Sequence, residues 1–368
     1  MLIEKLNFNK KIDPISDILQ WKERNEGAPI IIWGAGSVAY GVLSKLLRNN
    51  ICIDEVVIDS LSCRVDERIE KSNFTICTWN EIRKKYNKVA VLIGHSHFEK
   101  KYEIEKEPFV DAVFVLVDCV RSDTEINSSD IFKNEEKFER VYNLLEDNVS
   151  KNNMVAYLNT KLTNDIGYVL EAYLKNHQLN YFDTDVLNLG DGSVYVDCGA
   201  YEGENIDDFI FSCPNYDKIV AIEVIKEQAD FLIEKYNTER DVTVYNIGVS
   251  DHSGKDLFMI NGQSTCLCDA LDDGGVVIPV DTLDNVLTDM ERIDIIKLCI
   301  GNTILPILCG AKNVIKKYHP QFVVSAGIGA QILTDTIDWL SNNSKYRFYL
   351  RFVNPIPESI ILYAIPQK

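Results

Sequence analysis

Acidic and small residues follow two neighbouring apolar stretches in the second half of the chain. Asp197 ends the first stretch, and Glu223 ends the second. The loop after Asp197 carries three small residues: Gly199, Ala200 and Gly203. Small residues let a backbone approach a ligand closely, and a carboxylate at a strand end can accept hydrogen bonds from two sugar hydroxyls. The pattern therefore predicts a site that holds an adenosyl group by its ribose.

The position of Asp197 distinguishes between two cofactors that this layout could hold. A dinucleotide would place its pyrophosphate at the glycine loop, where the carboxylate of Asp197 would repel it. The same carboxylate could bind the ammonium group of a methionine moiety. We therefore predict S-adenosylmethionine (SAM) as the cofactor. Its binding residues are predicted to be Asp197, Gly199, Ala200, Gly203 and Glu223, with Asn246 flanking the adenine.

A second glycine loop lies in the first half of the chain. Gly34 and Gly36 follow an isoleucine-rich stretch, Ala39 takes the third position of the dinucleotide fingerprint, and Asp59 lies 20 positions further on. The helix that this loop would open has an N-terminus suited to a phosphate. These residues form a candidate second nucleotide site. The alternative is a degenerate Rossmann half that binds nothing, and no catalytic Ser/Tyr/Lys or His/Asp set accompanies the loop to support a hydride transfer.

Each of the two glycine loops follows a predicted strand and precedes a predicted helix, so strands that alternate with helices must position both loops. A length of 368 residues favours two domains. Strands are predicted in the first half at 28–33, 55–59, 89–93 and 112–117, and in the second at 194–197, 218–223, 242–246, 294–298, 320–325, 346–352 and 359–364. Such alternation predicts parallel sheets with right-handed crossovers. The expected fold class is α/β with two doubly wound Rossmann-like domains, at 1–125 and 178–368, joined by a helical bridge at 126–177.

The last two predicted strands are joined by a turn that contains Pro355 and Pro357. A short turn between two strands predicts an antiparallel hairpin. A parallel sheet that ends in such a hairpin is typical of class I methyltransferases.

Composition excludes several classes of partner. The formal net charge of −18 argues against a nucleic-acid or anionic-membrane surface, which needs clustered Lys and Arg. The ten cysteines have no framework spacing, so we expect reduced thiols in a cytoplasmic protein. The N-terminus does not have the pattern of a signal peptide, and no stretch approaches the length of a membrane span. Cys266 and Cys268 lack the further ligands of a usual zinc site, so no metal is expected. The sequence does not determine the oligomeric state.

As a set, the motifs of the second half are similar to those of a known family. Residues 178–364 resemble the FkbM-type SAM-dependent methyltransferases. The segments that carry this resemblance are Tyr181–Asp183, Val196–Glu204, Ile222–Glu223, Asn246–Asp251, Pro279–Asp284, Gly310–Pro320, Phe348–Arg351 and Leu362–Ala364. The resemblance implies a class I methyltransferase-like domain at 178–368 and methyl transfer from SAM to a hydroxyl of a small acceptor, such as a sugar or a natural product. Several family members also carry an N-terminal half with a Gly-x-Gly loop.

One segment departs from the family pattern, which normally reads Lys-x-Asp-x-Glu-Gly-x-Glu at the end of the fourth strand. Here Lys297 is kept, but Cys299 stands at the Asp position, Gly301 at the first Glu and Ile304 at the second Glu. These changes remove the proton-accepting groups and the ligand charge that the family has at this edge. The sequence therefore leaves two readings open. The chain is an O-methyltransferase, or it is a catalytically lapsed protein of the same fold that binds SAM, a nucleotide or a protein partner without turnover.

Overall fold

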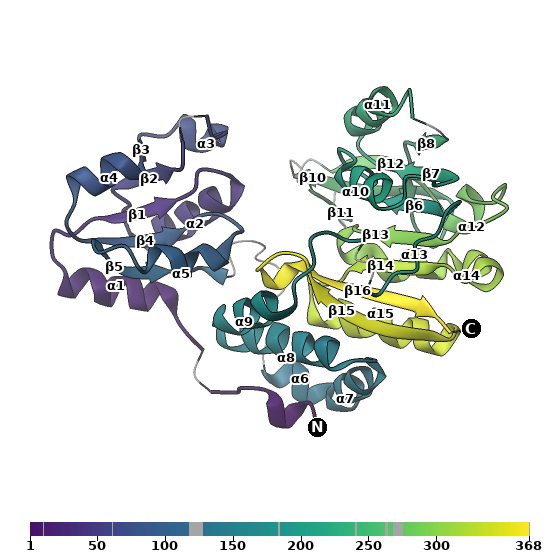
Figure 1. Cartoon of the computed structure of the whole chain (residues 1–368), viewed down its shortest axis with the longest axis horizontal. Coiled ribbons are helices and arrows are strands. Elements are labelled where there is room, and N and C mark those ends of the chain that lie inside the picture. The colour runs from purple at the N-terminus through teal and green to yellow at the C-terminus, as the bar shows by residue number, and fades with distance from the viewer. Residues whose placement is uncertain are drawn as a thin grey trace.

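The structure is a computed structural model in which two α/β units are joined by a group of helices (Figure 1). It describes residues 1–368 except 10, 61, 118–127, 183–184, 240, 262–263, 268–274 and 368. The predicted boundary between residues 125 and 126 and part of the segment Tyr181–Asp183 lie outside the described residues.

The N-terminal unit is built on a five-stranded parallel sheet with the order β3-β2-β1-β4-β5. Its strands are β1 (Ile30–Trp33), β2 (Glu55–Ile58), β3 (Thr75–Thr78), β4 (Val89–Ile93) and β5 (Val110–Phe114). Its helices are α1 (Pro14–Arg24), α2 (Ser37–Arg48), α3 (Glu67–Glu70), α4 (Trp79–Lys85), η2 (Phe98–Lys100) and α5 (Lys101–Ile104). The central strands are buried along their whole length, as continuous apolar strands of a parallel sheet are. Strand β3 was not predicted from the sequence, and its threonine ends suit a partly exposed edge strand.

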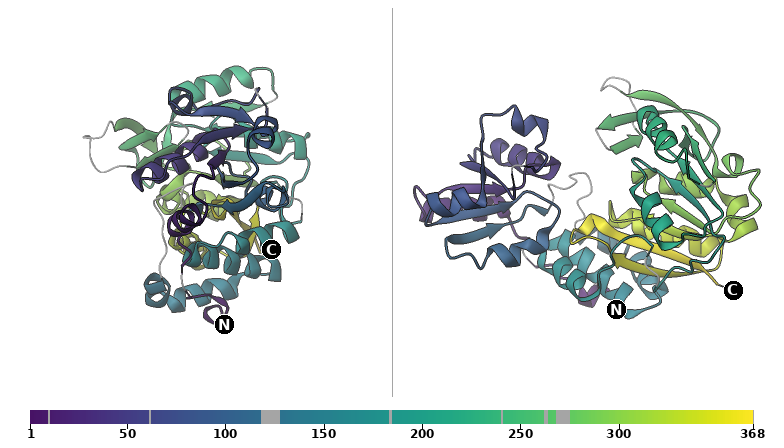
Figure 2. Two further views of the ribbon diagram at one scale, coloured as in Figure 1. Left: turned by 90° about the vertical axis from the view of Figure 1, so that its left-hand side faces the viewer. Right: turned by 45° about the horizontal axis from the view of Figure 1, so that its top comes forward.

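Four helices form the bridge: α6 (Ser128–Lys133), α7 (Glu135–Leu144), α8 (Asn148–Thr163) and α9 (Gly167–Asn176). The start of the chain, including η1 (Ile3–Lys5), contacts these helices. There Ile3 N donates to Glu139 Oε1 at 3.0 Å and Asn7 N donates to the Asn159 side chain at 2.6 Å. In the views of Figures 1 and 2 the N-terminus accordingly lies beside the bridge and away from the N-terminal sheet.

The C-terminal unit contains a seven-stranded sheet with the order β15-β16-β14-β13-β6-β7-β8. Its strands are β6 (Val194–Cys198), β7 (Lys218–Ile222), β8 (Val242–Tyr245), β13 (Ile295–Leu298), β14 (Gln321–Ser325), β15 (Tyr346–Phe352) and β16 (Ile360–Pro366). Its helices are α10 (Glu204–Ser212), α11 (Lys226–Lys235), α12 (Leu283–Val286), η5 (Gly301–Thr303), α13 (Ile304–Cys309), α14 (Lys312–Tyr318), α15 (Ala330–Asn343) and η6 (Pro357–Ser359). All neighbouring strands pair in parallel except β16, which is antiparallel to both β14 and β15. The last two strands therefore form the antiparallel pair that the proline turn indicated.

A second, four-stranded sheet interrupts the C-terminal unit. It has the order β11-β10-β12-β9 and consists of β9 (Gly248–Val249), β10 (Gly254–Asn261), β11 (Ser264–Leu267) and β12 (Val276–Asp281). No strand was predicted between residues 246 and 294, so this sheet was not expected from the sequence. The short apolar runs Leu257–Ile260 and Val276–Ile278 were the available signal for β10 and β12. Strand β12 alternates exposed and buried residues over much of its length.

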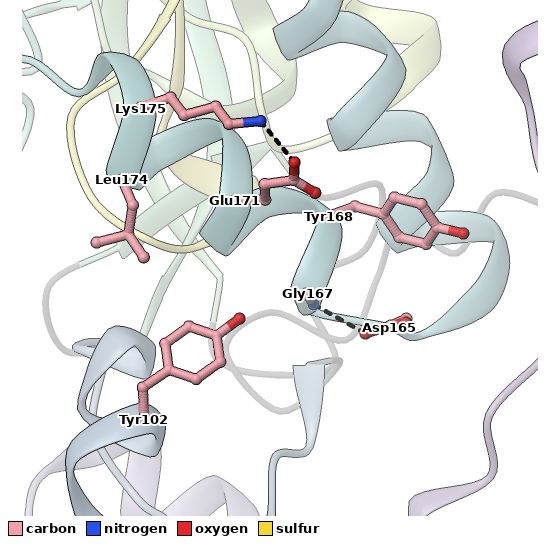
Figure 3. Close-up of a pocket in the computed structure, with 7 residues that line it drawn as sticks. All are labelled: Tyr102, Asp165, Gly167, Tyr168, Glu171, Leu174 and Lys175. Carbon is pink, nitrogen blue, oxygen red and sulfur yellow. Dashed lines mark hydrogen bonds and ion pairs between the residues drawn. The ribbon is translucent and has the colours of Figure 1, made fainter.

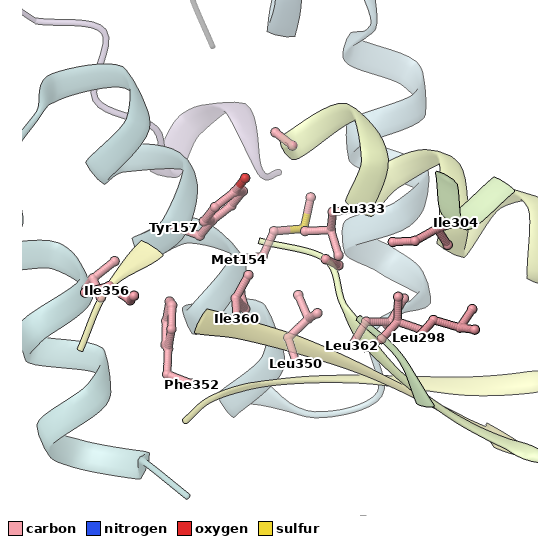
Figure 4. Close-up of a cluster of buried hydrophobic side chains, with 14 of the residues drawn as sticks. Met154, Tyr157, Leu298, Ile304, Leu333, Leu350, Phe352, Ile356, Ile360 and Leu362 are labelled. Carbon is pink, nitrogen blue, oxygen red and sulfur yellow. The ribbon is translucent and has the colours of Figure 1, made fainter. Parts of the chain in front are cut away.

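The bridge and the C-terminal sheet share one hydrophobic core. Figure 4 shows Met154 and Tyr157 of α8 beside Leu350, Phe352 and Leu362 of the β15–β16 pair. Polar groups join the same surfaces. The Asn153 amide donates to the carbonyl of Leu350 at 2.9 Å, and buried Arg351 forms an ion pair with Asp147 at 2.8 Å. The bridge is therefore fixed to the outer strand of the C-terminal sheet.

Candidate functional site

The predicted cofactor residues lie at the carboxyl edge of the C-terminal sheet. Along this sheet the strand order changes direction between β6 and β13, and ligands of open α/β sheets bind at such a switch point. Asp197 lies near the end of β6, and Glu223 directly follows β7, the next strand on one side. The topology thus brings together the two acidic strand ends.

Glu223 is 5% exposed, and its carboxylate is held by backbone donors. Its Oε2 accepts from the Tyr201 N–H at 2.8 Å, and its Oε1 accepts from the Ile225 N–H at 2.9 Å. A carboxylate has about four lone-pair positions, so both oxygens keep accepting capacity. The side-chain amide of Asn246 donates to the carbonyls of Glu223 and Val224, at 2.9 and 3.1 Å. Asn246 therefore fixes the loop in which Glu223 lies.

The conformation and packing of the loop after β6 require glycine at positions 199 and 203. Gly199 has φ +79°, and a Cβ built on it would lie 2.6 Å from the carbonyl oxygen of Cys299. Gly203 has φ +81°, and a Cβ there would overlap the hydroxyl of Tyr236, which donates to the Gly203 carbonyl at 2.8 Å. Ala200 is buried between them. These small residues fit the conformation of the loop and its packing against β13 and α11.

Asp197 is completely buried and forms an ion pair with Lys297. The two residues are partners in the parallel register of β6 and β13, so they occupy the same face of the sheet. Lys297 Nζ donates to Asp197 Oδ1 at 2.7 Å and to the Gly199 carbonyl at 3.0 Å. Burial raises the pKa of Asp197, and Lys297 opposes that rise. Burial lowers the pKa of Lys297, but Asp197 opposes this effect and the pKa is raised overall.

The predicted cofactor fits this site better at its ribose end than at its ammonium end. Glu223 is an acceptor at a strand end, as the ribose requires. Asp197 Oδ2 is buried without a hydrogen-bond partner among the described residues, so it retains the capacity to accept from an ammonium. However, Lys297 already neutralises that carboxylate. A ligand ammonium would therefore gain much less from Asp197 than the sequence analysis assumed.

Two of the three positions where the family has acids, Gly301 and Ile304, are not suited to carboxylates in this chain. Ile304 is 0% exposed and lies in the hydrophobic core with Leu298 (Figure 4). Gly301 has φ +65°, a conformation that favours glycine. Cys299 is exposed, and the pKa of neighbouring Tyr181 is raised by burial and further by Cys299. No acid or histidine therefore replaces the missing carboxylates at 299, 301 and 304 themselves.

The candidate second site lies at the corresponding edge of the N-terminal sheet. Gly34 and Gly36 lie between β1 and α2, Ala39 is buried within α2, and Asp59 follows β2. His95, which comes immediately after Gly94 at the end of β4, was not among the predicted site residues. The available signal was a histidine placed directly after a buried apolar stretch.

A cavity of about 620 Å³ lies between the N-terminal unit and the bridge, away from both predicted sites. Figure 3 shows Tyr102 of α5 on one side and Glu171, Leu174 and Lys175 of α9 on the other. A smaller cavity of about 380 Å³ lies beside α11 and β8, with Leu232 and Val244 in its lining. Neither cavity is lined by Asp197, Gly199 or Glu223.

Within the described part of the chain, no group of three His, Cys, Asp or Glu side chains is placed to hold a metal ion. Cys268, which is close to Cys266 in the sequence, lies outside the described residues. No helix among those described is both long and apolar enough to cross a membrane.

One comparison with known proteins finds a similar fold. No family model and no curated protein matches the sequence. Among solved structures, the chain is similar to the crystal structure of methyltransferase FkbM from Methylobacillus flagellatus KT, with a TM-score of 0.66 and 19% sequence identity. The match covers 96% of this chain and 95% of that chain. At this level of identity the likeness shows the fold, which is that of an FkbM-like methyltransferase.

Proposed function

We propose that this chain, which has an FkbM-like methyltransferase fold, binds SAM at the carboxyl edge of its C-terminal sheet and transfers the methyl group to a hydroxyl of a small acceptor, such as a sugar or a natural product. The observation that carries the proposal is the buried carboxylate of Glu223 at the end of β7, beside the glycine loop that follows β6 and next to the switch point of the sheet. This is where an α/β sheet of this type presents an acid to a ribose.

Glu223 and Lys297 have different roles in this proposal. Glu223 accepts hydrogen bonds from the ribose hydroxyls. Lys297, through its bond to the Gly199 carbonyl, holds the loop from Gly199 to Gly203 in the conformation that approaches the ligand. The bound SAM supplies an electrophilic methyl group. The protein then has to align the acceptor oxygen and exclude water, and alignment alone can supply much of the rate enhancement.

A second candidate function is supported by the residues at the end of β13. Ile304 is a core residue, and Cys299 supplies a thiol where the family has a carboxylate. A protein with this edge could bind SAM, a nucleotide or a protein partner without turnover. Restoring the acids is a poor test, because Ile304→Glu would bury an unpaired charge in the core.

Calorimetric titration of the full-length protein with SAM and with S-adenosylhomocysteine tests the binding step. We expect binding by the parent and a loss of about tenfold or more in Glu223→Gln, since the neutral amide is a weaker acceptor for two hydroxyls. Glu227→Gln, on the exposed face of α11, is the matched control and should bind like the parent. Thermal unfolding of each variant checks that the fold is intact. If folded parent protein binds neither ligand, the proposal is wrong.

Methyl transfer is tested separately with SAM labelled in the methyl group and a panel of sugars and hydroxylated natural products. Label transferred to an acceptor supports the methyltransferase. Binding without transfer to any member of the panel favours the second candidate. We also propose that the protein is cytoplasmic. Seven cysteines in the described part of the chain form no disulfide, as expected of a protein in a reducing compartment.

A further inference from the structure

The strand β8 lies at an open edge of the C-terminal sheet. It is last in the strand order and pairs with β7, and no described strand lies on its other side. Figure 1 shows β8 at the outer end of the sheet, next to α11. Proteins usually protect an open edge with a lysine, a proline, a bulge or a covering segment. The sequence of β8, Val-Thr-Val-Tyr, contains neither lysine nor proline, and its register with β7 is regular, so this edge can pair with another strand.

The hydrogen bonds to β7 determine which groups of β8 point outward. The carbonyls of Asp241 and Tyr245 accept from backbone N–H groups of β7 and of the residue that follows it, at 2.9 and 3.0 Å. The odd-numbered residues of β8 therefore bond to β7. Because the direction of the backbone groups alternates along a strand, the N–H and C=O groups of Val242 and Val244 point away from the sheet.

Apolar side chains beside this edge are exposed. The cavity of about 380 Å³ between α11 and β8 is lined by Ile233, Val242 and Val244, among other residues. Ile233 of α11 is 55% exposed, and Tyr245 at the end of β8 is 41% exposed. Exposed apolar surface that lies next to an open strand edge is typical of a site for another chain.

A second copy of the same strand fits this edge. When two copies of β8 pair antiparallel about a two-fold axis at Thr243, Val242 of one copy lies opposite Val244 of the other. Each such pair exchanges two hydrogen bonds, so the outward groups of both valines are paired in both copies. Asp241 then lies opposite Tyr245 of the second copy, so the two copies of Asp241 do not face each other. Neighbouring β-branched side chains also pack favourably across the two strands.

Other registers of the same pairing are less favourable. An axis at Val242 or at Val244 would pair one valine with its own copy and leave the other valine opposite a residue outside β8. An axis between two residues would place outward groups opposite groups that already bond to β7. The register centred on Thr243 therefore satisfies the outward groups of both valines from within β8 alone.

We propose that two copies of this chain associate through β8 into a dimer whose C-terminal sheets form one continuous sheet. The two-fold axis passes through Thr243 and is perpendicular to the sheet. The α11 helices of the two copies therefore lie on the same face of the joined sheet, and Ile233 of each copy becomes buried beside the paired strands. The proposal does not depend on the proposed methyl transfer.

Sedimentation equilibrium of the full-length protein tests the proposal. We expect a reversible dimer with a dissociation constant below about 100 µM, and Ile233→Lys should raise that constant by about tenfold or more because it places a charge in the interface. Leu47→Lys is the matched control, since Leu47 is 53% exposed on a helix of the N-terminal unit, and it should dimerise like the parent. A parent protein that remains monomeric at this concentration would refute the proposal. So would a folded Ile233→Lys protein that dimerises as strongly as Leu47→Lys.

A charge swap at Thr243 tests the position of the axis. The two copies of Thr243 form a pair without mutual hydrogen bonds, in which the Cα atoms of an antiparallel ladder are about 4.5 Å apart. Thr243→Lys and Thr243→Glu therefore each place like charges opposite each other, and each variant alone should dimerise about tenfold more weakly or worse than the parent. An equimolar mixture of the two should form a mixed dimer, and thermal unfolding checks that each variant is folded. Parent-like dimerisation of either variant alone, or a mixture that remains monomeric, would refute the proposed pairing.

Discussion

We expect His95 to stay neutral in the folded protein well below the pH at which an ordinary histidine gains its proton. Burial is the main cause, because it removes water from the imidazolium, and Lys100 and His97 add like charge. Asp59 is the group that opposes them. The folded protein thus resists protonation at a residue that the unfolded chain protonates near pH 6.5.

The size of the effect follows from the two pKa values. The folded value of about 4 lies below the ordinary value of 6.5, so the unfolded state binds the extra proton first and stability falls as the pH is lowered between these values. At pH 5 the difference amounts to about 2 kcal/mol of unfolding free energy at most, because the ring is partly exposed and water screens part of the charge.

Two measurements check this expectation. Carbon-13 NMR of labelled histidine follows the five histidines of the chain, and the His95 signal is identified by its absence in His95→Gln. We expect that signal to show no titration between pH 8 and pH 5. Denaturant unfolding is followed by tryptophan fluorescence, since three of the four tryptophans, Trp21, Trp33 and Trp79, lie in the N-terminal unit. The parent should lose stability relative to His95→Gln as the pH falls.

His177→Gln is the matched control, because it removes a histidine at the end of α9 and keeps His95, Lys100 and His97, so it should keep the loss of stability at low pH. A His95 signal that titrates with a midpoint near 6.5 would refute the reasoning. So would a parent and a His95→Gln protein whose stabilities change in parallel between pH 8 and pH 5.

Three further predictions concern the C-terminal unit. Lys297→Met leaves Asp197 buried without its partner, so we expect a loss of about 3–5 kcal/mol in denaturant unfolding. Gly203→Ala forces a side chain to a positive φ and against a tyrosine hydroxyl, so we expect a loss of about 1–3 kcal/mol in the same assay. Arg351→Met removes the ion pair between β15 and α8, so the bridge should become more sensitive to limited proteolysis, with cleavage measured against the parent over time.

Matched variants separate these effects from general damage. Lys226→Met breaks an exposed ion pair on α11 and should leave stability unchanged. Gly190→Ala adds a methyl group in open space and should do the same. A Lys297→Met protein as stable as Lys226→Met would contradict the buried ion pair. Equal stability of Gly203→Ala and Gly190→Ala would contradict the packing of the loop, and parent-like proteolysis of Arg351→Met would contradict the attachment of the bridge.

Most of the main strands could be predicted from the sequence, because a buried parallel strand is a short continuous apolar stretch and can be recognised locally. The strands β1, β2, β4, β6 and β7 all begin and end within two residues of the predicted ranges. The edge strand β3 was missed because most of its residues are exposed or partly exposed, so it has no continuous apolar stretch. The four-stranded sheet was missed although β10 and β12 contain short apolar runs, because the order β11-β10-β12-β9 depends on pairing between strands rather than on a local pattern.

The sequence by itself determined the alternating α/β order, the acidic residues at the strand ends and the loss of acids at Cys299, Gly301 and Ile304. Only the tertiary structure decided what surrounds them. Asp197 and Lys297 are 100 positions apart, and they neutralise each other because β6 and β13 are adjacent in the sheet. The pKa of His95 depends in the same way on burial and on charges brought from other parts of the fold. Electrostatic interactions act through space, so the chemistry of a carboxylate or an imidazole is set by its folded neighbours rather than by its place in the chain.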